Sequence, residues 1–351
     1  MTDRVLFCDQ LTKAFGETIA LNKTSIELFS GEILAILGPS GCGKSTLLRA
    51  IAGFENIDRG DITINGKTVS SEDTFTPPEK RRVGMVFQDY ALFPHLTVED
   101  NVAFGANSSS KGDKISLVLQ MLKLVGLEGM ERRYPHELSG GQQQRVAVAR
   151  TLAANPITIL LDEPFSNLDA TMRNEIRHTV RQALQGRGVA TIIVTHDREE
   201  AFTIADRVAV MNAGQIEQVD TPENMYRSPA SKFVASMTGT ANFLPAKIIS
   251  NRAVTELGKF QWVSPTNEIV ESDEVELLVR PDDFLVLPNP NASVQVTSRE
   301  YRGDAMVISA ELGSGNIIQC RQGPYSDLPV GTSVDLVPSR SAPFVWIRHP
   351  G

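Results

Sequence analysis

The chain has 351 residues, 41% of them hydrophobic and 22% charged, with a formal net charge of −8 at pH 7. This length favours two domains with a sizeable core. The net negative charge argues against a protein that acts mainly by binding nucleic-acid phosphates. Cys8, Cys42 and Cys320 stand far apart and form no CxxC pair, which argues against a disulfide framework or zinc site and favours a reducing compartment.

Neither a signal peptide nor a membrane span is expected. The segment 1–4 is not a basic stretch followed by an apolar core, as a signal peptide requires. No apolar run approaches the roughly 20 residues that a membrane helix needs. If the protein serves a membrane, we expect it to do so by docking on partners.

The first two thirds of the chain alternate short apolar runs with helical patterns. The apolar runs predict buried strands at 32–37, 83–88, 158–161 and 190–195. Helices are predicted to follow some of them, at 45–52 and 142–154. Alternation of this kind indicates an α/β core with a mainly parallel sheet.

The pattern of apolar and turn-forming residues changes from about Phe243 onward. Short apolar runs punctuated by Pro and Gly stand at 275–279, 293–297, 306–312 and 333–337. This pattern is typical of a small β-rich domain, either a sandwich or a barrel. We therefore expect an α/β domain over residues 1–240 and a β-rich domain over residues 241–351.

The predicted strand at 32–37 runs into a glycine-rich loop that fits G-x-x-x-x-G-K-[ST], the Walker A pattern. The loop consists of Gly38, Pro39, Ser40, Gly41, Cys42, Gly43, Lys44, Ser45 and Thr46. Its glycines let several backbone N–H groups converge on phosphates, and the following helix adds its positive N-terminal end. Lys44 can reach the β- and γ-phosphates, and the Ser45 hydroxyl can bind Mg²⁺. The sequence Lys44-Ser45-Thr46 after the last glycine disfavours a dinucleotide-binding loop.

Two acids, Asp162 and Glu163, end the predicted strand at 158–161. A carboxylate at this position can hold the Mg²⁺ shell, as a Walker B aspartate does, and the next acid can polarise an attacking water. Many strands end in acids, so the pair gains its meaning from sharing a chain with the Walker A loop.

A second glycine-rich segment precedes the predicted helix at 142–154. It consists of Ser139, Gly140, Gly141 and Gln142. Ser139 is a good helix N-cap, and the glycines permit close backbone approach. Alone, the segment would indicate only a capped helix start. Its place between the two Walker motifs favours a second phosphate-facing surface.

At this point the sequence resembles the ABC transporter ATPases. The segment 138–142 is similar to their signature motif, Gln88 to their Q-loop glutamine, Asp169 to their D-loop aspartate and His196 to their switch histidine. Phe15 lies where the family places an aromatic side chain on adenine. The resemblance spans roughly residues 4–240. It implies a P-loop NTPase domain with a helical subdomain, followed by a small β-rich domain of OB or TOBE type.

The resemblance also implies a mechanism. Two copies of the chain pair head to tail, and each ATP lies between the Walker A loop of one copy and the signature motif of the other. Glu163 is then the general base, His196 a γ-phosphate contact and Lys44 the charge stabiliser. Gln88 contacts the metal and senses the membrane partner, so Mg²⁺ would be held by Ser45, Gln88 and Asp162.

Cys42 lies inside the phosphate loop, near Lys44 and a helix N-terminus. Such neighbours favour the thiolate form, although a small, tolerated loop residue is the simpler interpretation. We expect alkylation of Cys42 to block hydrolysis and ATP to protect it.

The resemblance extends to importers whose permeases are separate subunits. The loop 90–97 follows Gln88, where the family receives its permease, although an apolar loop could equally be internal packing. The partners implied are membrane permeases and, indirectly, a periplasmic or lipoprotein substrate-binding protein, which places the chain at the cytoplasmic face of the inner membrane. Segments 132–138, 164–166 and 196–201 resemble ferric iron importers. Polyamine, sulfate or sugar uptake is the alternative. A soluble ABC ATPase acting on DNA or the ribosome is disfavoured by the acidic charge.

Overall fold

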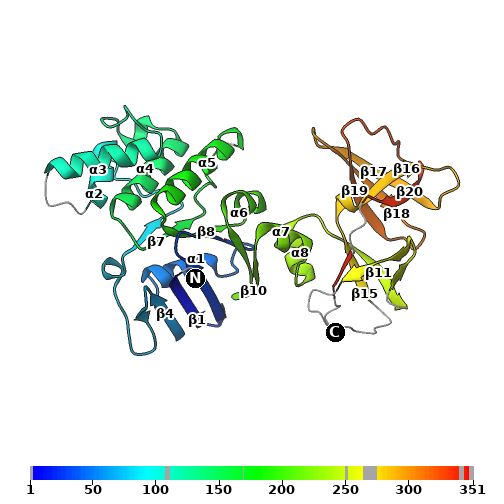
Figure 1. Ribbon diagram of the computed structural model, residues 1–351, viewed down its shortest axis with the longest axis horizontal. Helices are drawn as coiled ribbons and strands as arrows, with labels where there is room; N and C mark the ends of the chain where they lie inside the picture. Colours follow the sequence, from blue (N-terminus) through cyan, green and yellow to red (C-terminus); the bar gives the residue numbers. More distant parts are fainter. Residues whose placement is uncertain are drawn as a thin grey trace. The chain divides into compact units, whose positions relative to one another are not determined.

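The structure is a computed structural model that describes residues 3–106, 111–168, 170–249, 252–263, 275–339 and 344–347. It forms two compact units, residues 1–222 and 223–351 (Figure 1). The elements of the first unit position the nucleotide motifs.

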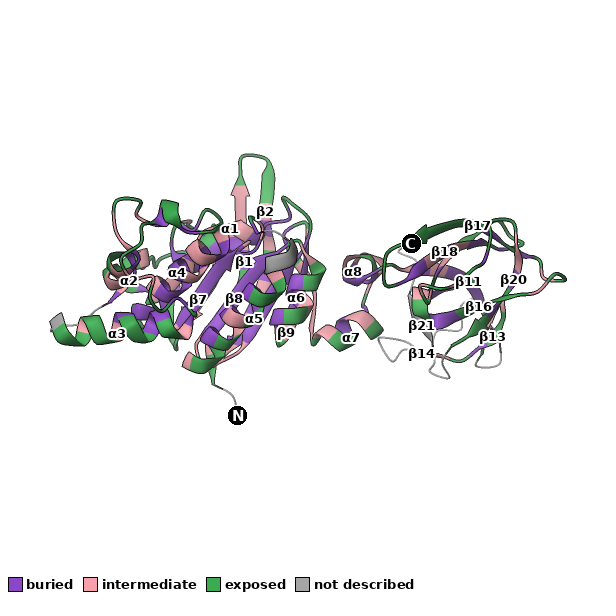
Figure 2. Cartoon of the chain, turned by 90° about the horizontal axis from the view of Figure 1, so that it is seen from above, coloured by how far each residue is buried: buried purple, intermediate pink, exposed green. Residues whose placement is uncertain are grey.

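The centre of the first unit is a six-stranded sheet of order β10-β9-β3-β8-β7-β6. Its strands are β3 (Ile33–Leu37), β6 (Val83–Val86), β7 (Thr158–Asp162), β8 (Ala190–Thr195), β9 (Arg207–Asn212) and β10 (Gln215–Asp220). All neighbouring pairs are parallel except β9 with β10. Strands β7 and β8 are buried along their whole length (Figure 2), as expected when both faces of a parallel sheet are covered. The predicted α/β core with a mainly parallel sheet is confirmed.

A second, antiparallel sheet of order β2-β1-β4-β5 belongs to the same unit. Its strands are β1 (Arg4–Phe15), β2 (Thr18–Phe29), β4 (Arg59–Ile64) and β5 (Lys67–Ser70). Helix α1 (Lys44–Ala52) contributes Leu47 and Ile51 to a buried cluster that also contains Leu6 of β1 and Ile36 of β3. The helix that begins at the phosphate loop is therefore held by apolar contacts with both sheets.

The helical subdomain contains α2 (Val98–Gly105), α3 (Lys111–Leu124) and α4 (Gly140–Ala153), which lie together in Figure 1. A Cβ at Gly105 would lie 2.1 Å from the Arg150 carbonyl oxygen, so glycine is needed for α2 to pack this closely on α4. The remaining helices of the unit are α5 (Ala170–Arg187) and α6 (Arg198–Ile204), with short turns at η1 (Pro78–Lys80) and η2 (Pro135–Glu137). None of the helices that the structure describes is long and apolar enough to cross a membrane.

The second unit is β-rich, with two sheets of order β13-β12-β11-β15-β21-β14 and β16-β20-β17-β18-β19. The first sheet comprises β11 (Asn242–Ile249), β12 (Arg252–Thr255), β13 (Gly258–Phe260), β14 (Trp262–Val263), β15 (Val275–Val279) and β21 (Phe344–Ile347). The second comprises β16 (Phe284–Pro288), β17 (Val294–Tyr301), β18 (Met306–Glu311), β19 (Ile317–Gln322) and β20 (Ser333–Pro338), and η3 (Pro281–Asp283) precedes it. The β-rich second domain predicted from the sequence is confirmed.

The two units divide elsewhere than the sequence predicts. The sequence predicts a division after residue 240, whereas the compact units divide after residue 222. Helices α7 (Pro222–Arg227) and α8 (Lys232–Thr238) account for the difference. The reason is a buried arginine, Arg280, which follows β15 and is 4% exposed. Its guanidinium donates to the carbonyls of Ala235 and Tyr226, at 2.8 and 2.9 Å.

We expect Arg280→Ala to destabilise the second unit by about 2–4 kcal/mol, because it leaves buried helix carbonyls without their donor. Both tryptophans of the chain, Trp262 and Trp346, lie in this unit, so urea unfolding followed by tryptophan fluorescence reports on it selectively. Arg302→Ala is the matched control, because its ion pair with Glu300 is exposed. Equal unfolding midpoints for the two variants would contradict the role given to Arg280.

Candidate nucleotide-binding site

The phosphate loop connects β3 to α1 through two glycines that have no room for a side chain. A Cβ at Gly38 would lie 2.4 Å from the Met211 carbonyl oxygen, and one at Gly43 would lie 2.2 Å from that of Ala20. Gly43 also has a φ of 110° and begins α1 without a side-chain cap. The first N–H groups of α1 are therefore left for a ligand, and a helix N-terminus favours an anion.

Lys44 is folded back over its own loop. Its side chain is buried, and its Nζ donates to the carbonyl oxygens of Gly38 and Pro39, both at 2.8 Å. These two partners are neutral carbonyls and use two of the three ammonium donors, so the hydrogen bonds themselves do not compensate its charge. A buried cation in this state attracts an anion strongly.

The acidic end of β7 faces the start of α1. The Ser45 hydroxyl donates to Asp162 Oδ1 at 3.0 Å. Burial raises the pKa of the Asp162 carboxyl, while the hydrogen bond from Ser45 opposes this rise. A hydroxyl and a carboxylate held side by side are hard oxygen ligands of the kind that Mg²⁺ prefers.

Glu163 follows in a left-handed backbone conformation, with a φ of 43°. Such a conformation is costly for a residue other than glycine and is often found at functional sites. The Glu163 N–H donates to the Val194 carbonyl at 3.0 Å, and the Glu163 Oε2 lies 3.1 Å from His196 Nδ1. The general-base candidate and the histidine candidate are thus in direct contact.

Parallel pairing explains why these segments meet. In the register of the sheet, Leu37 of β3 is opposite Thr195 of β8, and Asp162 of β7 is opposite Val194 of β8. The carboxyl ends of all three strands therefore lie at one edge, where ligands bind in open α/β sheets. The structure brings the phosphate loop, the acidic pair and His196 together at this edge.

Ser139 begins α4 as a capping box. The Ser139 N–H donates to Gln142 Oε1 at 3.0 Å, and the Gln142 N–H donates to Ser139 Oγ at 3.4 Å. Gly140 follows Ser139 and Gly141 is buried, as in a tightly packed helix start. Among the hydrogen bonds of the described residues, none joins this segment to the phosphate loop of the same chain.

Two other residues predicted for the site, Gln88 and Phe15, make no described side-chain contact with the cluster at this sheet edge. The Gln88 side chain is exposed, and the Gln88 carbonyl accepts a hydrogen bond from Asn167 Nδ2 at 3.0 Å. Phe15 ends β1 with an exposed ring, 5.1 Å from Lys13 Nζ. Asp169 lies outside the described residues. The structure thus leaves Gln88 and Phe15 accessible without joining them to the central cluster.

The sequence alone does not reveal an arginine that holds the segment directly after His196. Arg177 of α5 is only 2% exposed, and its Nη2 lies 3.4 Å from Asp197 Oδ2 and 3.5 Å from Glu200 Oε1. The sequence does contain one indication of this role, because Arg173 and Arg177 are four residues apart and therefore share a helix face. It could not be interpreted without knowing that this face packs against the segment after His196.

The loop 90–97, expected either to receive a permease or to pack internally, is held by Asn101. This residue is fully buried, and its side chain accepts from the Phe93 N–H at 2.9 Å and donates to the Leu96 and Thr97 carbonyls at 3.1 and 3.0 Å. The Phe93 ring packs 4.6 Å from that of Phe104, whose side chain is 68% exposed. The buried Asn101 side chain therefore fixes the backbone of the loop, which borders the exposed Phe104 ring.

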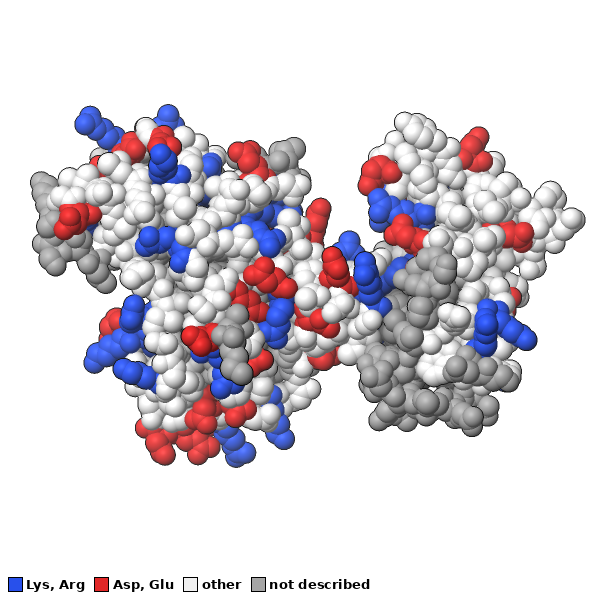
Figure 3. Space-filling view, in the orientation of Figure 1, with Lys and Arg blue, Asp and Glu red and all other residues white. Residues whose placement is uncertain are grey.

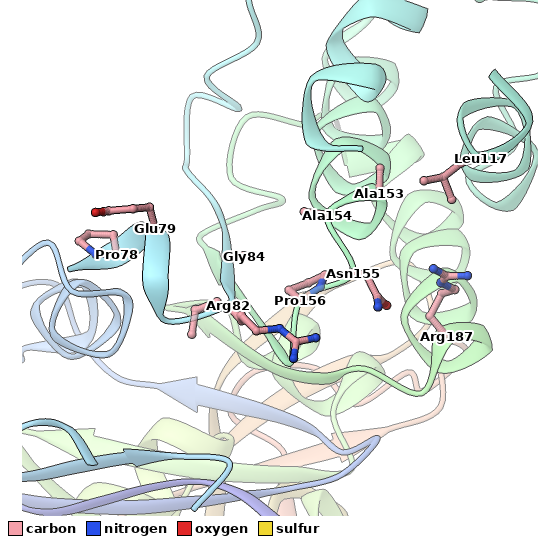
Figure 4. A pocket seen from close by; sticks show the side chains of 11 residues that line it. Pro78, Glu79, Arg82, Gly84, Leu117, Ala153, Ala154, Asn155, Pro156 and Arg187 are labelled. Atoms are coloured by element: carbon pink, nitrogen blue, oxygen red, sulfur yellow. The ribbon is translucent and has the colours of Figure 1, made fainter. Parts of the chain in front are cut away.

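A separate cavity of about 550 Å³ lies at the opposite end of β7 (Figure 4). Arg82 and Arg187 lie on either side of Asn155 in this view, and Leu117 of α3 lines the wall. Helices α4 and α5 end here, and basic side chains near helix C-termini complement the exposed carbonyls. None of the predicted nucleotide-site residues lines this cavity.

Comparison with known proteins identifies related chains. Residues 21–166 match the family described as ABC transporter, and residues 277–346 match the TOBE domain. A sulfate/thiosulfate import ATP-binding protein of Chromobacterium violaceum is 48% identical over 279 residues, covering 79% of this chain and 75% of the relative.

Two further relatives match over nearly their whole length. A spermidine/putrescine import ATP-binding protein of Nitratidesulfovibrio vulgaris is 40% identical over 360 residues, covering 98% of this chain and 96% of the relative. An Fe(3+) ions import ATP-binding protein of Haemophilus influenzae is 39% identical over 348 residues, with coverages of 97% and 98%.

A solved structure is similar to the first unit. It is a dimeric ATP-binding cassette in a post-hydrolysis state, bound to ADP and Pi. It has 32% identity and a TM-score of 0.54, and the match covers 62% of this chain and 98% of that one.

Cys42 differs from the expectation that its neighbours favour the thiolate. The side chain is buried, with Sγ 3.9 Å from Lys44 Nζ. Burial raises the pKa of the Cys42 thiol, and the lowering effect of Lys44 does not overcome it. Lys44 does lower the pKa of the thiol, as expected, but the expected thiolate was wrong because the loop encloses the sulfur instead of presenting it to solvent.

We expect N-ethylmaleimide to modify Cys42 slowly at pH 7 and faster as the pH rises, because the thiolate is the nucleophile. The adduct should abolish ATP hydrolysis, since the space beside Sγ is already taken up by the Gly38 backbone, and ATP should slow the modification. Mass spectrometry and ATPase assays measure both effects.

Cys42→Ser is the control, and it should hydrolyse ATP and resist the reagent. The buried Cys320, whose pKa is raised to about 12 by burial, should react more slowly than Cys42. Full activity with Cys42 completely modified would contradict the prediction.

Proposed function

We propose that this chain, which belongs to the family of ABC transporter ATP-binding subunits, hydrolyses ATP to drive uptake of ferric iron into a bacterial cell. The observation that carries the ATPase assignment is one cluster at the carboxyl edge of the parallel sheet. It contains Lys44 at the phosphate loop, the Ser45–Asp162 pair and the Glu163–His196 pair.

In this proposal the residues act on the γ-phosphate of ATP. The N–H groups of the phosphate loop and Lys44 bind the β- and γ-phosphates, and Phe15 stacks on the adenine. Glu163 takes a proton from water, the water oxygen bonds to the γ-phosphorus, and the bond to the leaving ADP oxygen breaks. His196 contacts the γ-phosphate. The carbonyl of Val194 fixes the Glu163 backbone, which keeps this carboxylate beside His196.

A magnesium ion fits the oxygen groups at this edge. The Ser45 hydroxyl and the Asp162 carboxylate lie 3.0 Å apart, and the Gln88 amide is free to approach because its side chain is exposed. Bound Mg²⁺ would neutralise charge on the β- and γ-phosphates. Few protein ligands suffice, because Mg²⁺ in such sites keeps waters and phosphate oxygens.

The second half of the site would come from a second copy of the chain. The segment 139–142 is a helix start whose glycines permit close approach, and it makes no described hydrogen bond to its own phosphate loop. In a head-to-tail homodimer this helix start would face the γ-phosphate of the partner copy. ATP would then hold the dimer closed, and loss of the γ-phosphate would release it.

We expect Glu163→Gln to trap an ATP-bound dimer, because glutamine keeps the shape of the side chain but cannot accept the proton from water. Steady-state hydrolysis should fall by at least about 100-fold, while a dimer persists in gel filtration with ATP and Mg²⁺. Glu199→Gln, in the first turn of α6, is the control and should behave like the wild type. Rapid steady-state turnover by Glu163→Gln would remove Glu163 from this role.

A separate membrane permease is the partner that the surface near Gln88 fits. The loop 90–97 is held rigidly by Asn101 and borders the exposed Phe104 ring, which offers an apolar contact beside the nucleotide site. Docking there would place the chain at the cytoplasmic face of the inner membrane and couple it, through the permease, to a periplasmic or lipoprotein substrate-binding protein. The second unit would serve as an accessory or regulatory domain.

The cargo assignment rests on similarity, because none of the nucleotide-site residues would touch a cargo. Ferric iron is favoured by segments 132–138, 164–166 and 196–201, and by the Haemophilus influenzae relative, which matches nearly end to end. Sulfate is the second candidate because of the 48% identical Chromobacterium violaceum relative, and polyamines are supported by another near-full-length match. Sugar uptake remains an alternative from resemblance alone. Action on DNA or the ribosome is disfavoured by the net charge of −8, and on the face drawn in Figure 3 basic and acidic side chains are interspersed.

We expect deletion of the gene to abolish uptake of labelled Fe³⁺ and to leave uptake of labelled sulfate, putrescine and maltose unchanged. Complementation with the wild-type chain should restore iron uptake, whereas complementation with Glu163→Gln should not. Loss of sulfate or putrescine uptake with intact iron uptake would overturn the iron assignment and select the other cargo.

A further inference from the structure

The segment 166–168 is hydrogen-bonded to two parts of the nucleotide site and to helix α5. Ser166 Oγ donates to the Glu163 carbonyl at 2.9 Å. Asn167 Nδ2 donates to the Gln88 carbonyl at 3.0 Å. The Leu168 carbonyl accepts from Arg173 Nε at 2.9 Å. This short segment therefore contacts the general-base residue, the loop after β6 and helix α5.

The other end of the Arg173 guanidinium faces the segment that carries the histidine. Its Nη1 lies 3.8 Å from Asp197 Oδ2, and Asp197 directly follows His196. Asp197 is also the N-cap of α6, where its Oδ1 accepts from the Glu199 N–H at 2.7 Å. The position of the Asp197 carboxylate therefore sets both the start of α6 and the backbone next to His196.

Arg177 also holds Asp197, the residue that Arg173 contacts. It is almost fully buried and pairs with both Asp197 and Glu200. Thr195 Oγ1 donates to Glu200 Oε2 at 2.5 Å, so the residue before His196 is tied to the same cluster. Arg173 is the more exposed arginine, with one third of its side chain accessible, and it alone of the two reaches the 166–168 segment.

We propose that Arg173 is a positioning residue that couples the 166–168 segment to His196 through Asp197. This inference rests on the proposed ATPase mechanism. A planar guanidinium carries its nitrogens at fixed positions, so one side chain bridges the Leu168 carbonyl, through a hydrogen bond from Nε at 2.9 Å, and the Asp197 carboxylate, through an ion-pair contact of Nη1 at 3.8 Å. A displacement of the Gln88 loop, which Asn167 contacts, then moves His196 relative to the γ-phosphate. Misplacement of a catalytic group by about 1 Å can cost about 100-fold in rate.

The test compares Arg173→Ala with a matched variant on the same helix, Arg181→Ala. Arg181 makes the same kinds of contact at the other end of α6, donating to the Thr203 carbonyl at 2.7 Å and pairing with Asp206 at 3.3 Å. For Arg173→Ala we expect kcat to fall by about tenfold. The Kd for a fluorescent ATP analogue should stay within about twofold, and Tm should match that of Arg181→Ala. Arg181→Ala should retain the wild-type kcat.

Arg173→Lys separates charge from geometry. A single ammonium does not reproduce these fixed positions, so we expect it to recover only a minor part of the lost kcat. The inference fails if Arg173→Ala keeps the wild-type kcat or if Arg173→Lys restores it fully. It also fails if the loss in kcat is matched by losses in ATP affinity and Tm, since a merely structural role would produce that pattern. These measurements use the purified chain, so a negative iron-uptake result leaves them unaffected.

Discussion

Parallel pairing of β3, β7 and β8 is the constraint on which the nucleotide site depends. Each strand ends in a different chemical group: the phosphate loop after Leu37, the acidic pair Asp162 and Glu163, and His196. Because the strands run in the same direction with a fixed register, these groups meet at one edge of the sheet. The burial of all three strands ties this arrangement to the core of the unit, so the geometry of the site is as stable as the fold.

The electrostatics of this edge suit the magnesium nucleotide that we propose as the ligand. Lys44 is buried against neutral carbonyls, and burial disfavours the charged form of the Asp162 carboxylate. A triphosphate with its metal would offset both costs at once, by supplying negative charge to the lysine and positive charge to the aspartate. The loop and β7 hold Lys44 and Asp162 in place before a nucleotide binds. Relieving the unfavourable burial of these two groups would therefore contribute to the free energy of binding.

The loops around this edge are joined by polar contacts of side chains with backbone carbonyls and carboxylates. Asn167 connects to Gln88, Arg173 connects Leu168 to Asp197, and Asn101 holds the loop that follows Gln88. The hydrogen bonds among these contacts are directional and weaken steeply when misaligned, so the relative positions of these loops depend on a few polar side chains. The second unit uses the same device at Arg280, where one guanidinium attaches α7 and α8 to the β-rich sheets.

The sequence by itself determined the α/β order of the first unit, the β-rich character of the second and the residues of the phosphate loop, the acidic pair and the capped start of α4. These features are local, since glycines at fixed spacing, a strand ending in acids and an N-cap serine each act over a few residues. Only the tertiary structure decided that the Cys42 thiol is enclosed and harder to ionise, and that α7 and α8 belong with the second unit. The contact of Arg173 and Arg177 with Asp197 was likewise decided there. Each of these depends on side chains far apart in sequence, whose separation, burial and charge are set by how the sheets and helices pack.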